Sequence, residues 1–567
     1  MSVAAENGLD LVFLWHMHQP DYRLPESRDF ALPWVYLHAL KDYSDMAGHL
    51  ERHPKIRAVV NFVPVLLDQI EDYVDQLTTG ALRDPLLRVL ACPDAEALSA
   101  AERQLVLQSC FRTNHLRMVD PFPPYKRLHD LYRLVASHGD TALGYLSGSY
   151  FIDLATWYHL AWSGETLRRQ EPLVAELMSR GEAYTAAHRR RLLDLIGRTL
   201  AGLIPRYRAL AERGQVELSA TPQAHPLAPL LLDLRCAREA VVALPLPDAP
   251  GYPGGRDRVD AHIAAAAASH ERRFGAPPRG FWPAEGAVST PLLQRLSAHG
   301  SRWAASGEGV LRNSVGTAAR PYARERDLYH PWRLAAAPET LLFFRDDRLS
   351  DKIGFEYAQW HGKDAAQHFV GEIEAIRRAA PAGERPLVCV ILDGENAWEF
   401  FPYNGYYFFE DLYGLLDEHP QIRTTTFSDY VTGMGEAAAE LPRLTAGSWV
   451  YGTLTTWIGD ADKNRAWDLL CEAKQSYDRV MASGRLEAGA RLAAAARLAV
   501  CESSDWFWWF GDYNPADVVA SFDDLFRRNL RDLYRLLQLP APHELAAPIS
   551  RGGGAPEAGG TMRRGSE

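Results

Sequence analysis

The chain has 567 residues, of which 47% are hydrophobic, so it can bury a large core and is long enough for two to four domains. Its formal net charge of −11 provides no broad cationic field for a nucleic-acid backbone or an anionic membrane, so we expect neither as a partner. The 15 tryptophans, 24 tyrosines and 21 phenylalanines instead offer many flat faces that suit stacking against apolar ligand surfaces such as sugar rings.

The cysteines and the first residues of the chain indicate where the protein works. The six cysteines lie far apart and form no C-x-x-C pair, which argues against a zinc ribbon or a redox dithiol. The first apolar run, at 11–15, is far shorter than the ~18 residues that a bilayer span needs, and no basic segment precedes it. The sequence therefore predicts a cytoplasmic protein with reduced thiols and indicates no particular oligomeric state.

Seven short apolar runs, rich in residues that favour strands, are separated by long stretches with helical patterns. They are the segments 11–15, 57–65, 215–220, 279–285, 302–308, 340–346 and 386–395. Parallel strands need crossover connections and bury both faces, which matches such runs and such connectors. The sequence predicts an α/β fold built on a distorted seven-stranded (β/α)7 barrel.

Helical patterns also interrupt and follow the predicted barrel. The second and third runs are separated by about 150 residues with helical periodicity, which predicts a helical insertion at about 75–213 that ends near Gly214. Three more helical segments follow the seventh run, and the last residues are rich in glycine and poor in large apolar side chains. The expected division is a catalytic barrel at 8–435 including the insertion, a C-terminal helical domain at 436–545 that completes the active site, and a disordered tail at 546–567.

Two carboxylates stand out where predicted strands end, which is where functional side chains gather in barrels. Glu285 and Asp393 end different strands, and each has a tryptophan nearby in the sequence. Cleavage of a glycosidic bond needs one carboxylate that attacks and one carboxylic acid that donates a proton. Strand-end carboxylates also cap helices or bind loop amides, so the pattern alone leaves both interpretations open.

The first strand ends in the sequence WHMHQP, which carries His16 and His18. Alternation along a strand places both imidazoles on the same side of the sheet. The pair could pack in the core, bind zinc as in other barrel sugar enzymes, or contact a sugar. The pattern by itself does not decide among these.

Five ordered motifs resemble the conserved regions of glycoside hydrolase family 57, in its amylopullulanase and α-amylase-like branch. They are WHMHQP, GQVELSATPQAHPLAPLL, GFWPAEGAVS, LDGENAWEFFPYNG and ESSDWFWWFGD. The resemblance extends from about residue 11 to about residue 540. It implies a retaining reaction on α-glucans, at α-1,4 links and also at α-1,6 links if the chain acts as an amylopullulanase does.

The resemblance also implies roles for individual residues. Glu285 would be the nucleophile and Asp393 the general acid/base, whose pKa we expect local burial or a neighbouring negative charge to raise. The residues expected around the cleaved sugar are His16, His18, His225, Glu395 and Asp505, with Trp282, Trp398 and Trp506 as stacking faces. No metal ligand and no cofactor is predicted, and a structural calcium ion stays open.

Three alternatives to hydrolysis by carboxylates remain. A 4-α-glucanotransferase or a branching-type transglycosylase would share the first half of the reaction and differ in what resolves the glycosyl-enzyme. A zinc-dependent glycosidase would use His16 and His18 as metal ligands. A non-catalytic glucan-binding protein would retain the binding cleft without the reaction, but it would not need both Glu285 and Asp393.

Overall fold

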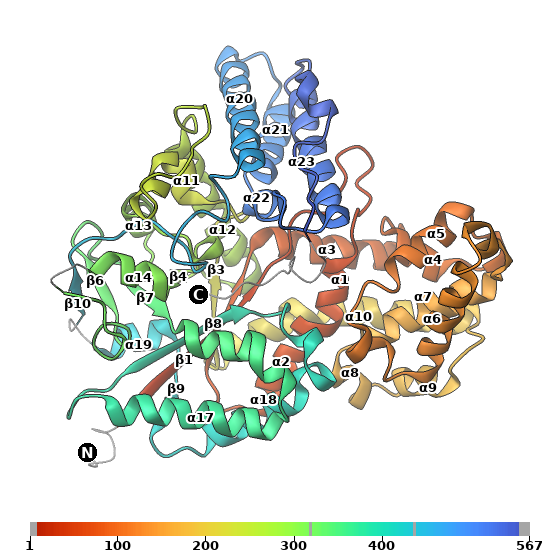
Figure 1. Ribbon diagram of the computed structural model, residues 1–567, viewed down its shortest axis with the longest axis horizontal. Helices are drawn as coiled ribbons and strands as arrows, with labels where there is room; N and C mark the ends of the chain where they lie inside the picture. The colour runs from red at the N-terminus through yellow and green to blue at the C-terminus, as the bar shows by residue number, and fades with distance from the viewer. Residues whose placement is uncertain (1–7, 317–319, 435–437, 555–567) are drawn as a thin grey trace.

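The computed structural model describes residues 8–316, 320–434 and 438–554. A barrel of seven strands with parallel neighbours lies at its centre, and every residue of the first strand is buried. The strands are β1 (Leu9–Met17), β2 (Ala58–Phe62), β3 (Val216–Ala220), β4 (Gly280–Phe281), β5 (Trp303–Gly307), β7 (Leu341–Arg345) and β8 (Leu387–Asp393). Each coincides with one of the seven predicted runs, so the predicted fold class is confirmed (Figure 1).

The barrel is distorted between β7 and β8. Near the end of β7, the backbone N–H of Asp346 donates to the carbonyl oxygen of Cys389 on β8. Near its start, β7 pairs instead with the antiparallel strand β6 (Trp332–Leu334), which pairs in turn with β10 (Ala439–Leu441). A further short strand, β9 (Ile422–Thr424), pairs with β1. These three strands were not predicted, because three residues are too few to show a periodic pattern.

Helices connect successive strands and cover the barrel. The α-helices of the barrel region outside the insertion are α1 (Trp34–His38), α2 (Ser44–Arg52), α11 (Ala228–Leu232), α12 (Gly255–Phe274), α13 (Thr290–Ala298), α14 (Glu308–Val315), α15 (Arg324–Asp327), α16 (Asp347–Asp351), α17 (Gly362–Ala379), α18 (Tyr406–Asp417) and α19 (Phe427–Met434). Amphipathic α17 and α18 pack against each other along much of their length. The connectors thus bury the outer face of the sheet, as a parallel barrel requires.

The predicted insertion consists of helices between β2 and β3. They are α3 (Pro64–Thr79), α4 (Pro85–Ala91), α5 (Ala100–Ser109), α6 (Pro123–Ala136), α7 (Gly148–Ala161), α8 (Glu165–Gln170), α9 (Pro172–Arg180) and α10 (Ala186–Glu212). Figure 1 shows α4 to α9 grouped at one side of the barrel, with the long α10 leading back to it. Helix α10 ends two residues before Gly214, whose φ of 72° is the left-handed conformation expected after a helix.

Four helices follow the barrel: α20 (Ala461–Ser483), α21 (Ala488–Cys501), α22 (Ser504–Trp509) and α23 (Ala516–Leu536). Figure 1 shows α20, α21 and α23 standing side by side, with the short α22 between them and the barrel. The sequence predicted the three long helices and missed α22. No helix in the described part of the chain is both long and apolar enough to cross a bilayer.

The prediction of a disordered tail at 546–567 is partly wrong. Residues 546–554 are held against the C-terminal helices, since the backbone N–H of Ser550 donates to Asp523 and that of Gly553 to the carbonyl oxygen of Asn514. Specific backbone hydrogen bonds offset the poor apolar content there. Residues 555–567 lie outside the described residues, as does the predicted domain boundary at 435–436, so the division into domains stays a prediction.

Candidate active site

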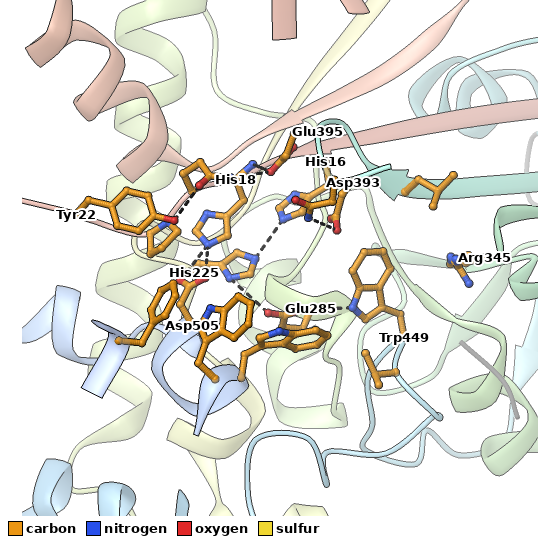
Figure 2. A pocket seen from close by; sticks show the side chains of 18 of the residues that line it. His16, His18, Tyr22, His225, Glu285, Arg345, Asp393, Glu395, Trp449 and Asp505 are labelled. Atoms are coloured by element: carbon orange, nitrogen blue, oxygen red, sulfur yellow. Dashed lines mark hydrogen bonds and ion pairs between the residues drawn. The ribbon is translucent and has the colours of Figure 1, made fainter. Parts of the chain in front are cut away.

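The C-terminal ends of the barrel strands surround one cleft, and all seven polar residues predicted for the site line it (Figure 2). His16 and His18 come from the end of β1, His225 from the loop after β3, Glu285 from the turn after β4, Asp393 and Glu395 from the end of β8, and Asp505 from α22. The empty volume of the cleft is about 890 Å³ including its open mouth. The fold therefore brings together polar side chains from four strands and a C-terminal helix.

Glu285 occupies an unusual backbone position. Its φ of 59° and ψ of 21° place it in the left-handed region, which costs a non-glycine residue about 1–2 kcal/mol. The next residue is Gly286, where a Cβ atom would lie 2.6 Å from the ring of Trp282. The tight turn thus directs the Glu285 carboxyl group into the cleft. Its Oε1 accepts a hydrogen bond from Ser504 Oγ (3.0 Å) and its Oε2 accepts one from the indole of Trp449 (3.3 Å).

Burial raises the pKa of both central carboxyl groups. It raises that of Glu285 to about 8, with further contributions from the negative charges of Asp505 and Asp393. It raises that of Asp393 to about 6, against a lowering by the hydrogen bond from Asn396 and by the charges of His18 and Arg345. The predicted direction for Asp393 is therefore seen, but Glu285 holds its proton more tightly. At neutral pH the empty cleft favours a protonated Glu285.

Three imidazole rings form a stack along one wall of the cleft. The ring centroids of His18 and His225 are 3.8 Å apart, and those of His16 and His225 are 5.2 Å apart. Burial lowers the pKa of His16 to about 3 and that of His225 well below its usual range, with neighbouring imidazoles adding to both effects. Both rings are therefore neutral at physiological pH, and each can offer one donor and one acceptor.

A chain of polar contacts connects this stack to Glu285. His16 donates through Nδ1 to Asn61 Oδ1 (2.7 Å), and its Nε2 lies 3.2 Å from Nε2 of His225. The other ring nitrogen of His225, Nδ1, lies 2.7 Å from Ser504 Oγ, which also contacts Glu285. Asn61 thereby fixes the tautomer and the ring orientation of His16.

Asp505 and Glu395 both contact His18. His18 Nε2 lies 3.0 Å from both carboxylate oxygens of Asp505, and the backbone N–H of His18 donates to Glu395 Oε1 (3.3 Å). Gln19 also donates to Glu395 Oε1 (3.5 Å), and Tyr22 donates to Gln19 (2.9 Å). These contacts leave carboxylate oxygens and ring edges facing the open space, where a polyhydroxylated ligand would find acceptors and donors.

The geometry does not favour a zinc site. Potential ligand atoms of His18, His225 and Asp505 lie within 4.8 Å of one another, whereas His16 is outside this group. An imidazole binds a metal in its own ring plane, but the rings of His18 and His225 are stacked at an angle of 19°. Their nitrogen lone pairs therefore run nearly parallel and do not converge on one ion, and both nitrogens of His225 are already engaged.

The prediction that three tryptophans offer stacking faces in the cleft is wrong. Trp282, Trp398 and Trp506 are at most 1% exposed and do not line the cleft. Trp398 packs against Trp15 and Phe409 in the core. Position next to a functional residue in the sequence does not place a side chain on the same face, since neighbouring residues point in different directions. The aromatic residues that do line the cleft are Tyr22, Phe355, Trp449, Trp508, Trp509 and Phe522.

Sequence reasoning also missed polar residues that shape the site. Ser504 joins Glu285 to His225, Asn61 orients His16, and Asn396 donates to Asp393 (2.9 Å). Ser504 directly precedes Asp505 in the fifth motif and Asn396 lies in the fourth, so the motifs contained the signal. A small hydroxyl or amide side chain has no pattern of its own that separates a site residue from a turn residue.

Comparisons with solved structures find the same overall fold. A branching enzyme from Thermococcus kodakaraensis matches with a TM-score of 0.57 at 16% identity, covering 94% of this chain and 90% of that one. An α-amylase from Thermotoga maritima matches with a TM-score of 0.57 at 13% identity, covering 94% and 93%. A branching enzyme from Pyrococcus horikoshii gives a TM-score of 0.56 at 15% identity, covering 95% and 96%. At such low identities these likenesses show the shared fold.

The family itself is shown by sequence. The sequence model described as glycosyl hydrolase family 57 matches residues 12–442, which is well over half of the chain and contains both Glu285 and Asp393. The family resemblance is confirmed, and with it the prediction that the protein is a glycoside hydrolase. The chain belongs to glycosyl hydrolase family 57.

Proposed function

We propose that the protein hydrolyses α-glucans by a retaining, double-displacement reaction with Glu285 as nucleophile and Asp393 as general acid/base. The observation that carries the proposal is that two buried carboxyl groups from different strands line the same cleft. Neither forms an ion pair with an arginine or lysine within the described part of the chain. Both are therefore free to exchange protons and to react.

Each step of the proposed reaction can be assigned to a group that lines the cleft. The carboxylate of Glu285 attacks the anomeric carbon while Asp393 transfers its proton to the departing glycosidic oxygen, giving a covalent glycosyl-enzyme. Asp393 then takes a proton from water, whose oxygen attacks the same carbon and releases Glu285. Ser504 and Trp449 hold the two oxygens of Glu285 throughout. Their hydrogen bonds stabilise the ionised form that attacks.

The order of the two pKa values has a consequence for this mechanism. With pKa values of about 8 for Glu285 and about 6 for Asp393, the form with an ionised nucleophile and a protonated acid is a minor species in the empty cleft. The positive charge that develops on the sugar in the transition state favours ionisation of Glu285. We therefore expect a bell-shaped dependence of kcat/KM on pH, with limbs near pH 6 and pH 8.

An α-glucan is the substrate class that the surroundings support. Neutral imidazoles, carboxylate oxygens and aromatic side chains line the cleft together, which suits an uncharged ligand with apolar ring faces and hydroxyl groups. The solved structures of similar fold include an α-amylase and two branching enzymes. Transfer to a sugar hydroxyl, as in a branching enzyme or a glucanotransferase, is therefore the second candidate function.

Product analysis on maltooligosaccharides, amylose and pullulan tests the proposal. Hydrolysis predicts shorter α-1,4 products that are released first as the α-anomer, which NMR of early time points detects. Oligosaccharides longer than the starting substrate, or new α-1,6 branches, would show transfer instead, and release of maltotriose from pullulan would show α-1,6 cleavage. An initial β-anomer would rule out the retaining mechanism.

The zinc alternative has its own test. Activity should survive treatment with a chelator, because the carboxylate mechanism uses no metal in any step. Loss of activity on chelation, with recovery on addition of Zn²⁺, would overturn the assignment.

A further inference from the structure

A second chamber adjoins the catalytic cleft. The two spaces share six wall residues: Gln19, Tyr22, Glu395, Asn396, Trp509 and Phe522. The cavity volume of the second chamber is about 410 Å³, which lies within the range of sites that hold small ligands, about 300–1,000 Å³. A linear ligand seated in the cleft could therefore continue past Glu395 into this chamber.

About half of the residues that line the second chamber come from outside the barrel. Arg112, Thr113 and Asn114 belong to the helical insertion, whereas Val518 and Ser521 belong to α23. The insertion and the C-terminal helices thus meet over the barrel and enclose a space that neither would form alone. Residues 112–114 lie in an aromatic and polar stretch of the insertion to which the catalytic cleft assigns no role.

The chamber combines flat apolar faces with isolated polar groups. Trp509 stacks on Phe522 with ring centroids 4.9 Å apart, and Trp34 packs at 5.7 Å from Trp162. Polar side chains such as Asn114 stand between these aromatic walls. This alternation matches a pyranose ring, which has an apolar C–H face and hydroxyl groups around its edge.

Two buried polar atoms at the chamber have no hydrogen-bond partner among the residues that the structure describes. They are Oε2 of Glu395 and Nε1 of Trp162, and each of these residues is only 2% exposed. Such atoms are rare in folded proteins and are expensive to leave unsatisfied. One is an acceptor and the other is a donor, and the hydroxyl groups of a sugar can satisfy both.

The charges at the chamber disfavour an anionic ligand. Glu395 and Glu399 both line it, and the nearby guanidinium of Arg112 lies 3.6 Å from a carboxylate oxygen of Asp517. A phosphorylated or carboxylated ligand would meet two carboxyl groups for one shared cation. A neutral sugar chain meets no such penalty.

We propose that the second chamber binds glucose units of the α-glucan chain that lie beyond the cleaved linkage, so that the enzyme selects chains long enough to occupy both spaces. This inference rests on the proposed action on α-glucans. It assigns the chamber to an uncharged, multi-unit α-glucan segment, and it gives the insertion a role in substrate selection.

Filling the chamber tests the inference. Ser521 lies on α23 and lines the chamber, so Ser521→Trp should occupy part of it, whereas its neighbour Ala520 is exposed and does not line it. Ala520→Trp is therefore the matched control. The measurement is the ratio of kcat/KM for maltoheptaose to that for maltotriose in the wild type and both variants, with melting temperatures as a check on folding.

We expect the wild type and Ala520→Trp to prefer maltoheptaose, and Ser521→Trp to lower the ratio about tenfold, which corresponds to about 1.4 kcal/mol of binding energy. An equal ratio in the two variants, or a wild-type ratio near one, would overturn the inference and leave the proposed function intact. Absence of turnover on both substrates in the wild type would instead contradict the proposed function.

A binding measurement covers the case in which Ser521→Trp does not fold. Calorimetric titration of the Glu285→Ala protein with the same two oligosaccharides should give a roughly tenfold lower Kd for maltoheptaose. Equal Kd values would contradict a binding role for the second chamber.

Discussion

Glu285 and Glu502 are both buried glutamates, yet their carboxyl groups have opposite proton affinities. Burial raises the pKa of Glu285 to about 8, and its hydrogen-bond donors are a hydroxyl and an indole. Burial acts on Glu502 in the same direction, but Arg258 and then His262 more than offset it and lower the pKa to about 2. The two guanidinium nitrogens of Arg258 lie 2.6 and 2.8 Å from the Glu502 oxygens.

This difference separates the proposed nucleophile from a structural carboxyl group. Glu502 ties α12 to the end of α21 through contacts that keep it ionised at every physiological pH. Glu285 has no such cation and stands on a strained turn at an open cleft. Of these two residues, the one buried without a compensating charge lines the cleft, whereas the one buried with such a charge connects two helices.

The largest effect that the comparison predicts is loss of turnover without loss of fold. Glu285→Ala or Asp393→Ala should lower kcat by at least about 10³-fold, because each removes an obligatory reacting group. The melting temperature should stay close to that of the wild type, since neither residue forms an ion pair with an arginine or lysine that its loss would break. Near-normal turnover in either variant would contradict the assigned roles.

Glu502→Gln should show the opposite behaviour. Removing the charge leaves the largely buried Arg258 without its charged partner, and breaking a fully buried ion pair costs roughly 3–5 kcal/mol, which is an upper bound here. Thermal unfolding should show a clearly lower melting temperature, while kcat at low temperature falls far less than in Glu285→Ala. A variant as stable as the wild type would show that the pair does not hold α12 and α21 together.

Glu285→Gln should stabilise the protein in a pH-dependent way. The folded protein raises the pKa of Glu285 from its usual ~4.3, so the folded state binds the extra proton, and stability falls as the pH rises from about 4 to about 8. Glutamine does not ionise and avoids that loss, which is on the order of a few kcal/mol. The melting temperatures of variant and wild type should agree near pH 4 and diverge in favour of the variant near pH 8. A constant difference across this range would contradict the raised pKa.

The smallest effects should come from two neighbours on α22 that act on Glu285 in opposite directions. Ser504→Ala removes a hydrogen bond that lowers the pKa of Glu285, whereas Asp505→Asn removes a charge that raises it. Because Glu285 sets the alkaline limb of the activity profile, that limb should move to higher pH in Ser504→Ala and to lower pH in Asp505→Asn. We expect kcat/KM to fall about tenfold or more in Ser504→Ala, which loses a hydrogen bond to a charged group. Shifts in the same direction would contradict this account.

Much of the barrel could be predicted from the sequence, because its strands are continuous buried runs such as Leu387–Asp393, flanked by long helical connectors. The short strands β6, β9 and β10 could not be predicted, since pairing with neighbours rather than any local pattern makes them strands. Helix α22 was missed for a similar reason, because its six residues show no helical period.

The sequence predicted which charged and imidazole residues lie together around the cleft. It did not predict which aromatic residues line that cleft. His16, Glu285 and Asp393 could be found because their side chains at strand ends have a chemical meaning of their own. The stacking role of Trp398 was wrong, since sequence does not show which face of a turn a side chain occupies. The higher pKa of Glu285 relative to Asp393 depends on burial and on charges from distant segments, which only the folded chain reveals.

The contact between His18 and Asp505 joins residues 487 positions apart. All residues up to Asp505 must therefore leave the ribosome before the cleft can be completed, although the seventh barrel strand already ends at Asp393. Contacts of such long sequence separation form late in folding, because the loop between them must be closed first. A nascent chain that has folded its barrel still lacks one wall of the cleft, so we expect activity to arise only after α22 has been synthesised.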